Sequence, residues 1–351
     1  MMQLTERQQS IAEFIKGNKK PASNHEISSF LAHTGEGVSR ITLVRDLNAL
    51  LAHGDIRSVG KGRNVKYEHS SFHPLLGDID AKGYLDDIEG KRLKDVIGFN
   101  HGLFANIGDL ISAREVDGLR VKNDGYTKRI SDLPPAIMKR EMERIIVELS
   151  WKSSRIEGNT YSLTDTETLL KDNVPAKGHS KEETIMILNH KKALDHIFAD
   201  TDRFKAMSLR EIEHVHRLLV EGLEINHGIR GRAVGVTGTR YAPLDNMHQI
   251  RESMEEAVSA INRADDPWSK ALIALLLIAY IQPFEDGNKR TSRLIANACL
   301  VAHGACPISF RSVDESEYRN ALLIFYEIQN ASLMKRIFLE QFDFSVKNYF
   351  L

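Results

Sequence analysis

The sequence predicts a mainly α-helical protein with two parts, and three observations lead to this fold class. From about Pro135 onward, apolar residues recur three and four positions apart, for example in the stretch 208–223. Only two short stretches, 56–67 and 231–243, have the pattern of a β-hairpin. The chain of 351 residues is long enough for two domains with a small connecting element.

Composition limits the classes of function. The net charge of −1 excludes a protein that binds nucleic acid through its overall charge, so DNA contact would need a local patch. The two cysteines, Cys299 and Cys306, lie in an apolar segment and favour free thiols in a reducing compartment. The sequence start lacks a signal-peptide pattern, and the apolar run Ala271–Ile281 is too short to span a bilayer. A cytoplasmic protein without a membrane partner is therefore expected.

The first domain is expected over residues 1–70 and contains three helices and a hairpin. The helices are predicted at 6–16, 25–32 and 39–53. Thr5 and Asn24 are the expected N-caps of the first two. The third has four apolar residues at the spacing of one helical face: Ile41, Val44, Leu47 and Leu51. A Gly-rich basic tip, 60–63, separates the two hairpin strands.

Residues 4–69 resemble a winged helix-turn-helix domain. The resemblance implies that the third helix enters the major groove of DNA and that the hairpin touches the backbone. The implied DNA contacts are Arg40, Thr42, Arg45 and Asn48 on the helix and Lys61, Arg63 and Lys66 on the hairpin. Residues 1–69 hold ten Lys and Arg against seven Asp and Glu, a mild positive bias. A winged helix used for protein contacts or dimerisation is the alternative.

A connector is expected over residues 71–134. His73-Pro74 and Pro134-Pro135 bracket it. One helix is predicted at 92–103, and the polar stretch Gly118–Gly125 is predicted to be a loop. No chemistry is indicated here.

The remaining residues, 135–351, are predicted to be helical apart from one insert. The helices are expected at 136–156, 165–171, 181–198, 208–223, 248–263, 271–281, 294–302, 314–328 and 332–342. In the insert, Gly231–Pro243, alternating valines around Thr237-Gly238 predict a β-hairpin.

The segment Gln282–Arg293 lies between two apolar helices and has the features of an anion site. A helix N-terminus presents unpaired N–H groups and a favourable dipole to negative charge. Gly287 allows close approach of a phosphate, and Arg290 can bind its oxygens in a bidentate manner. Asp286 offers the hard oxygen that Mg²⁺ prefers. The segment predicts a site for nucleotide phosphates.

The same residues resemble the core motif of the Fic family, His-Pro-Phe-x-(Asp/Glu)-Gly-Asn-(Gly/Lys)-Arg-x-x-Arg. Eight of the nine specified positions match, and Gln282 replaces the catalytic histidine. The resemblance covers residues 135–345 and implies transfer of AMP from ATP, with Mg²⁺, to a hydroxyl of an unknown target protein. It implies phosphate binding by Gly287, Asn288, Lys289, Arg290 and Arg293, and Mg²⁺ binding by Asp286. Lys289 also occurs in Doc-type relatives, which phosphorylate their targets.

Two further segments fit this resemblance. Ser153–Asn159 resembles the family's inhibitory motif, (Ser/Thr)-x-x-x-Glu-(Gly/Asn), with Ser153, Glu157 and Gly158 at its specified positions. The resemblance implies that Glu157 occupies Arg293. The predicted hairpin corresponds to the flap that docks the target by strand addition, with Val234, Val236, Thr237, Gly238 and Tyr241 as docking residues.

Gln282 leaves the function open between two interpretations. A glutamine amide cannot accept a proton near neutral pH, and loss of a general base costs about 10² to 10⁴ in rate. The chain is therefore expected to be an autoinhibited adenylyltransferase that is impaired, or a catalytically inactive regulator that senses a nucleotide and binds DNA. A base supplied by a partner subunit would also fit. The oligomeric state stays open, and a homodimer would fit because a DNA-reading winged helix usually pairs on a palindromic site.

Overall fold

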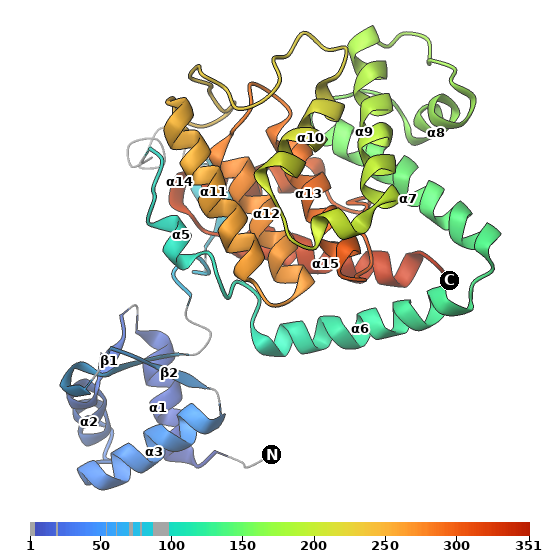
Figure 1. Cartoon of the computed structure of the whole chain (residues 1–351). Coiled ribbons are helices and arrows are strands. Elements are labelled where there is room, and N and C mark those ends of the chain that lie inside the picture. Colours follow the sequence, from blue (N-terminus) through green and yellow to red (C-terminus); the bar gives the residue numbers. More distant parts are fainter. Residues whose placement is uncertain are drawn as a thin grey trace. The chain divides into compact units, whose positions relative to one another are not determined.

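The computed structural model describes residues 4–18, 20–53, 55–60, 62–69, 73–77, 79–86 and 98–351. The chain divides into two compact units, residues 1–77 and 78–351 (Figure 1). Both are built mainly of helices, which confirms the predicted fold class. None of the described helices is long and apolar enough to cross a membrane.

The first unit packs three helices on a small antiparallel sheet. The helices are α1 (Glu6–Gly17), α2 (Asn24–His33) and α3 (Arg40–His53). The strands, in the order β1-β3-β2, are β1 (Ala22–Ser23), β3 (Lys66–His69) and β2 (Ile56–Val59). Thr5 caps α1 as predicted, but Ser23 rather than Asn24 caps α2, because Ser23 and Glu26 form a reciprocal capping box.

The inner face of α3 differs from the prediction. Leu43, Leu47 and Leu50 are buried in the core of this unit, while Ile41 is 84% exposed and Val44 38% exposed. Positions 43, 47 and 50 form a stripe spaced by four and three residues, and 41 and 44 fall on the other side of the helix. Apolar residues lie on two faces of this helix, and packing against α1 and the sheet buries only one of the two faces.

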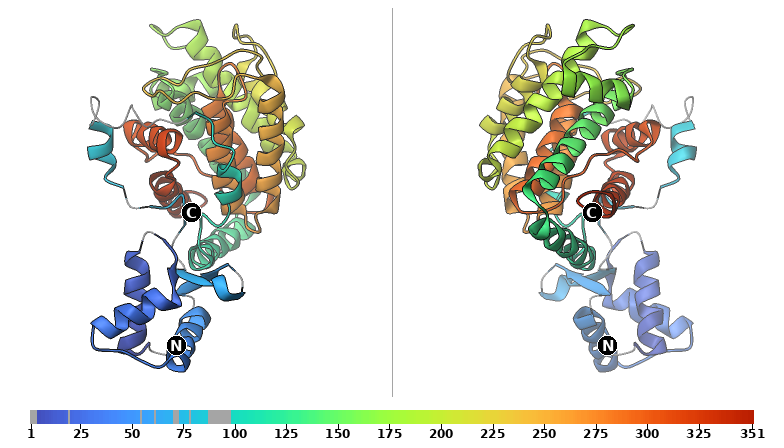
Figure 2. Two further views of the ribbon diagram at one scale, coloured as in Figure 1. Left: turned by 90° about the vertical axis from the view of Figure 1, so that its left-hand side faces the viewer. Right: turned by 90° about the vertical axis from the view of Figure 1, so that its right-hand side faces the viewer.

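The second unit is a helical assembly around a buried helix pair. Its helices before the pair are α4 (Ala81–Asp86), α5 (Leu103–Asn106), α6 (Ala113–Asp132), α7 (Pro135–Ile156), α8 (Leu163–Asp172), α9 (Lys181–Ala199), α10 (Leu209–Val220) and α11 (Met247–Arg263). The pair is α12 (Pro267–Ile281) and α13 (Asn288–Ala302), followed by α14 (Glu315–Ile328) and α15 (Ser332–Asn348). Every residue of α12 from Trp268 on is buried, because α11, α13 and α14 cover it. In both views of Figure 2, this orange pair lies between the red C-terminal helices and the yellow helices.

Two predictions for residues 71–134 need correction or fall outside the described part. The stretch Gly118–Gly125 is not a loop but lies within α6, a 20-residue helix that Ser112 caps. Its two glycines lower helix propensity, but Val116, Leu119 and Tyr126 are buried on one face, and α6 packs against α15. Residues 92–97 of the helix predicted at 92–103 lie outside the described residues, and α5 begins at Leu103.

The insert Gly231–Pro243 turns at Thr237-Gly238, as predicted, but its two arms are not paired as strands. Gly235 and Gly238 offer no side chains for cross-strand packing. Arg230 instead holds the segment in place through hydrogen bonds. Its Nη1 donates to the carbonyl of Arg232 at 2.6 Å, and its Nη2 donates to the carbonyl of Leu244.

Candidate functional site

The loop that joins α12 to α13 has a fixed shape. Gln282 and Gly287 both adopt left-handed backbone conformations, with φ of 52° and 78°. Asn288 cross-links the loop, because its Oδ1 accepts from the Phe284 N–H at 2.8 Å and its Nδ2 donates to the Phe284 carbonyl at 2.8 Å. The N-terminus of α13 is thereby held beside the end of α12, with no side-chain cap on its first turn.

A cavity of about 150 Å³ opens at this N-terminus. Six residues predicted from the motif line it: Gln282, Asp286, Gly287, Asn288, Lys289 and Arg290. The rest of the wall consists of Glu285 from the same loop, Glu157 of the predicted inhibitory segment, and Val234, Gly235, Val236 and Thr237 of the insert. Segments more than a hundred residues apart in the sequence thus converge on one small cavity.

Two arginines of α13 are buried near the cavity, and only Arg290 lines it. Arg290 is 2% exposed and Arg293 is completely buried. Arg290 donates from Nη2 to Oδ2 of Asp286 at 3.0 Å. In each guanidinium, the buried Nη1 atom has no hydrogen-bond partner. A guanidinium stays charged even when buried, so the unpaired donor of Arg290 makes the cavity attractive to an anion, and Arg293, which does not line the cavity, adds positive charge nearby.

Glu157 neutralises part of this charge. Its Oε1 accepts from Nη2 of Arg293 at 2.8 Å, and its Oε2 accepts from Nζ of Lys289 at 2.9 Å. Burial alone would raise the pKa of the carboxyl, but the two cations outweigh that effect and lower the pKa to about 2. Gly158 follows directly with φ of 98°, a conformation that favours glycine and lets the chain leave α7.

Ser153 links the same arginine to a histidine that sequence reasoning missed. Its Oγ accepts from Nε of Arg293 at 2.8 Å and lies 2.8 Å from Nε2 of His190. His190 is completely buried, and burial next to Arg293 and Arg290 holds its pKa well below the ordinary value. A neutral His190 can accept the Ser153 hydroxyl proton and so orient that oxygen toward Arg293. A single histidine within α9 carries no sequence signal for this role.

The side chain of Gln282 is committed to the loop. Its Nε2 donates to the carbonyl of Ala279 at 2.6 Å, and its Oε1 accepts from Nδ2 of Asn288 at 3.0 Å. The amide therefore satisfies one of the last carbonyls of α12 and one donor of the α13 turn. Arg230 was also missed by the sequence analysis. Its Nε donates to the Gln282 carbonyl at 2.7 Å and ties the insert to this loop.

Asp286 can take part in metal binding only together with other ligands. Its side chain is 64% exposed and contacts Arg290. No group of three or more His, Cys, Asp or Glu side chains that could hold a metal occurs in the described part of the chain. Mg²⁺ commonly uses one or two carboxylates together with substrate phosphates and water, so this residue set fits a nucleotide-bound Mg²⁺ and not a site made by protein alone.

The two ends of the predicted docking segment differ. Val234, Val236 and Thr237 line the cavity. Tyr241 is buried, donates to the Tyr280 carbonyl at 2.8 Å and stacks against the Tyr280 ring. It therefore anchors the insert and does not face a partner. Gly238 adopts φ of 85° at the turn, a conformation that favours glycine.

The predicted DNA-contacting residues are only partly accessible. Arg40, Arg45 and Asn48 are exposed on α3. Thr42 is half-buried, and its Oγ1 lies 3.0 Å from Oγ of Ser39. Lys61 and the side chain of Arg63 lie outside the described residues.

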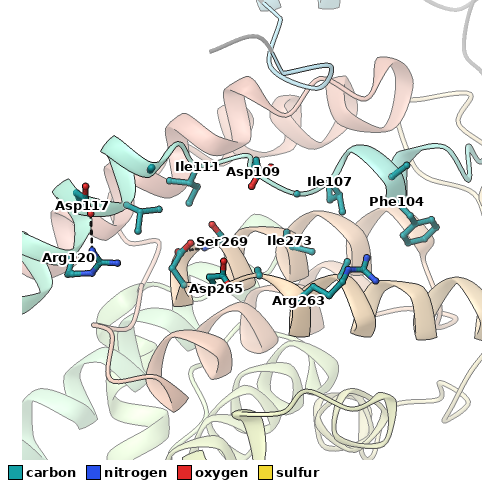
Figure 3. Close-up of a pocket in the computed structure, with 17 residues that line it drawn as sticks. Phe104, Ile107, Asp109, Ile111, Asp117, Arg120, Arg263, Asp265, Ser269 and Ile273 are labelled. Carbon is teal, nitrogen blue, oxygen red and sulfur yellow. Dashed lines mark hydrogen bonds and ion pairs between the residues drawn. The ribbon is translucent and has the colours of Figure 1, made fainter. Parts of the chain in front are cut away.

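A larger cavity of about 470 Å³ lies elsewhere in the second unit and shares no residue with the first (Figure 3). Ile107, Asp109 and Ile111 line one wall, and Asp265 and Ile273 line the other. It has two cationic lining residues, Arg120 and Arg263, and Arg120 is paired with Asp117 at 2.8 Å. The lining combines apolar and charged side chains of both signs.

Comparison with known proteins shows what the second unit resembles in sequence. Residues 206–300 match the sequence model of the Fic/DOC family. Two curated relatives are named protein adenylyltransferase Fic. The one from Nematostella vectensis is 26% identical over 190 residues, covering 52% of this chain and 43% of the relative. The one from Aedes aegypti is 27% identical over 224 residues, covering 63% and 44%.

Solved structures agree on the fold. Fic-1 (aa134–508) from C. elegans superposes with a TM-score of 0.59 at 22% identity, covering 68% of this chain and 72% of that one. A Fic domain containing signaling protein from Bacteroides thetaiotaomicron gives 0.54 at 22% identity, covering 66% and 95%. Residues 206–300 are therefore similar in sequence to the Fic/DOC family, and about two thirds of the chain shares the fold of these solved structures. The chain spans less than half the length of the two curated relatives described above.

Proposed function

We propose that this chain binds ATP at the 150 Å³ cavity and is a Fic-type protein adenylyltransferase, held in an inhibited state by Glu157 and impaired by Gln282. The observation that carries the proposal is the buried Arg290, which lines the cavity beside the uncapped N-terminus of α13 and has an unpaired guanidinium nitrogen. Triphosphate oxygens are the ligands that such donors and a helix N-terminus favour together. The relatives named as adenylyltransferases support the choice of ATP.

The contacts support a proposed role for each of these residues. Arg290 and the backbone around Gly287 would bind phosphate oxygens, and Lys289 at the rim would neutralise further charge. Asp286 would hold Mg²⁺ together with those phosphates, and the ion would supply charge neutralisation there. Glu157 occupies Arg293, so this arginine can bind phosphate only after the carboxylate leaves.

Gln282 limits the chemistry. In adenylyl transfer, a target hydroxyl oxygen forms a bond to the α-phosphorus while the bond to pyrophosphate breaks, and the hydroxyl proton must be accepted. A glutamine amide cannot accept it, and both polar ends of this side chain already bind the protein. The proton would pass to water, and transfer is expected to be about 10² to 10⁴ slower than with a positioned base.

The test combines binding and mass measurements on the full-length chain. The Glu157→Gly variant is incubated with Mg-ATP, and ATP affinity and intact mass are recorded. We expect measurable ATP binding and a slow gain of one AMP. A gain of one phosphate would replace the proposed chemistry with the Doc type. Failure of Glu157→Gly and wild type to bind ATP would overturn the proposal at its base.

A second function is favoured by the first unit. The exposed face of α3 carries Arg40 and Arg45 without a carboxylate. We propose that the chain binds DNA through this unit, so that a nucleotide in the second unit could act as a signal and not as a substrate. Gln282 favours this alternative, because nucleotide binding does not require a general base. ATP binding with no mass change, together with DNA binding, would support it over the transferase.

A further inference from the structure

The outer face of α3 is a single continuous stripe. Arg40, Ile41, Val44, Arg45 and Asn48 are all exposed, and their spacing of one, four, five and eight positions places them on one side of a helix. Leu43, Leu47 and Leu50 fill the opposite side. The stripe therefore projects from a helix that the core holds rigidly.

This stripe carries positive charge only. The one acidic residue of α3, Asp46, points inward and is 2% exposed. Its carboxylate accepts from Nε of Arg7 at 2.7 Å and from Nε2 of Gln8 at 3.2 Å. Arg40 and Arg45 form no ion pair with any residue in the described ranges. The charge of the stripe fits a polyanion.

An apolar group lies at the centre of this charged stripe. Ile41 is 84% exposed at the first turn of α3, and Val44 lies beside it. A helix that reads the major groove contacts bases with its N-terminal residues. The apolar group that DNA presents there is the 5-methyl of thymine, and arginine pairs with O6 and N7 of guanine.

We propose that α3 reads a thymine through Ile41 and a guanine through Arg45 in duplex DNA. The two residues are four positions apart, about 6 Å along the helix axis, which corresponds to one or two base steps. Asn48 lies one turn further along the same stripe. Thr42, a reader expected from the sequence, is replaced by Ile41, because the Thr42 hydroxyl bonds Ser39. The proposal rests on the DNA-binding function of the first unit.

The experiment begins with selection of duplexes from a randomised library by the full-length protein. In the selected site, each thymine is then replaced by deoxyuridine, which removes only the methyl group. We expect one such replacement to weaken wild-type binding about three- to fourfold. Ile41→Ala should bind the thymine and deoxyuridine duplexes equally. Val121→Ala, which truncates another exposed apolar residue at 72% exposure, should behave like wild type.

Arg45 gives an independent arm. Arg45→Ala should lose between about five- and a hundredfold of its preference for the guanine, while binding to non-specific duplex falls much less. ATP affinity, measured on the same preparations, should stay unchanged, so failure of the DNA proposal is separable from failure of the nucleotide site. The proposal is overturned if no duplex is enriched or if deoxyuridine weakens wild type and Ile41→Ala equally. It is also overturned if Ile41→Ala changes self-association and leaves DNA binding intact, since the stripe would then be a protein interface.

Discussion

Arg293 is completely buried, and its Nη2 donates to Oε1 of Glu157 at 2.8 Å. The arginine belongs to α13 and the carboxylate to the C-terminal end of α7. The other terminal nitrogen of Arg293, Nη1, has no hydrogen-bond partner. The Glu157 carboxylate therefore compensates the positive charge of a guanidinium that has little access to water. The net charge beside the cavity depends on this contact.

Replacing Glu157 should destabilise the protein without nucleotide and make it more responsive to ATP. Removing one partner of a buried ion pair costs about 3 to 5 kcal/mol, because the remaining charge is uncompensated. We expect Glu157→Gly to unfold at a lower temperature than wild type and to gain a larger increase in Tm from ATP or pyrophosphate. Glu167→Ala, which breaks an exposed pair with Lys171, is the matched control. Equal ATP-induced shifts in wild type and Glu157→Gly would contradict the anion-site assignment.

Acid should weaken the wild-type fold through Glu157. The pKa of this carboxyl is lowered from 4.5 to about 2, so its stabilising effect is complete above pH 4.5 and is lost as the pH falls toward 2. That difference corresponds to about 3 kcal/mol. Denaturant titrations across this pH range should show a shallower decline in the free energy of unfolding for Glu157→Gln than for wild type. Parallel curves would show that the ion pair adds little.

Lys289 should help to keep the pKa of the same carboxyl low. Its Nζ lies 2.9 Å from Oε2 of Glu157, and its charge helps to lower the pKa of Glu157. Lys289→Met is therefore expected to move acid unfolding to higher pH, but less than loss of Arg293 would. Lys191→Met removes an exposed lysine paired with Asp195 and should leave the profile unchanged.

Gln282→His should restore a proton acceptor. In the Glu157→Gly background, we expect adenylyl transfer to rise by about 10² to 10⁴, read as the rate of AMP gain by intact mass. In the background that retains Glu157, the increase should be much smaller, because Arg293 is still occupied. Gln282→Ala serves as the control and should not raise the rate. No gain in Gln282→His would mean that the base is not the limiting feature.

Ser153→Ala should disturb Arg293 without touching its charge. The substitution leaves Nε of Arg293 and Nε2 of His190 buried without partners. Each buried polar group left unsatisfied costs about 1 to 3 kcal/mol. We expect a clear fall in the free energy of unfolding by denaturant titration. Ser131→Ala, at an exposed position of α6, should have little effect.

The motif of the candidate phosphate site could be recognised from the sequence, but the residues that hold this motif in place could not. Gly287, Asn288 and Arg290 lie within four consecutive residues, so local chemistry and spacing could predict a phosphate site there. Arg230 and His190 were missed, because each acts through a contact made only after folding, with Gln282 and Ser153 respectively. The residues next to Arg230 and His190 in the sequence do not indicate these contacts.

Errors in the fold prediction have related causes. The stretch Gly118–Gly125 has two glycines and polar residues, yet burial of Val116, Leu119 and Tyr126 extends a helix through it. In α3, apolar residues occupy both faces, and the sequence could not rank Leu43 above Ile41. Tertiary packing decides both cases, and local propensity is a weak guide where the two conflict.

The Glu157 carboxylate can also be described as a tethered ligand of the cavity. Because it is carried by the same chain, its effective concentration at Arg293 does not depend on how much protein the cell contains. If the cavity binds ATP as proposed, the phosphates must displace this carboxylate to reach that arginine, so the strength of the internal contact would set a threshold ATP concentration for full engagement. Any partner that holds the end of α7 away from α13 would lower that threshold without touching the nucleotide.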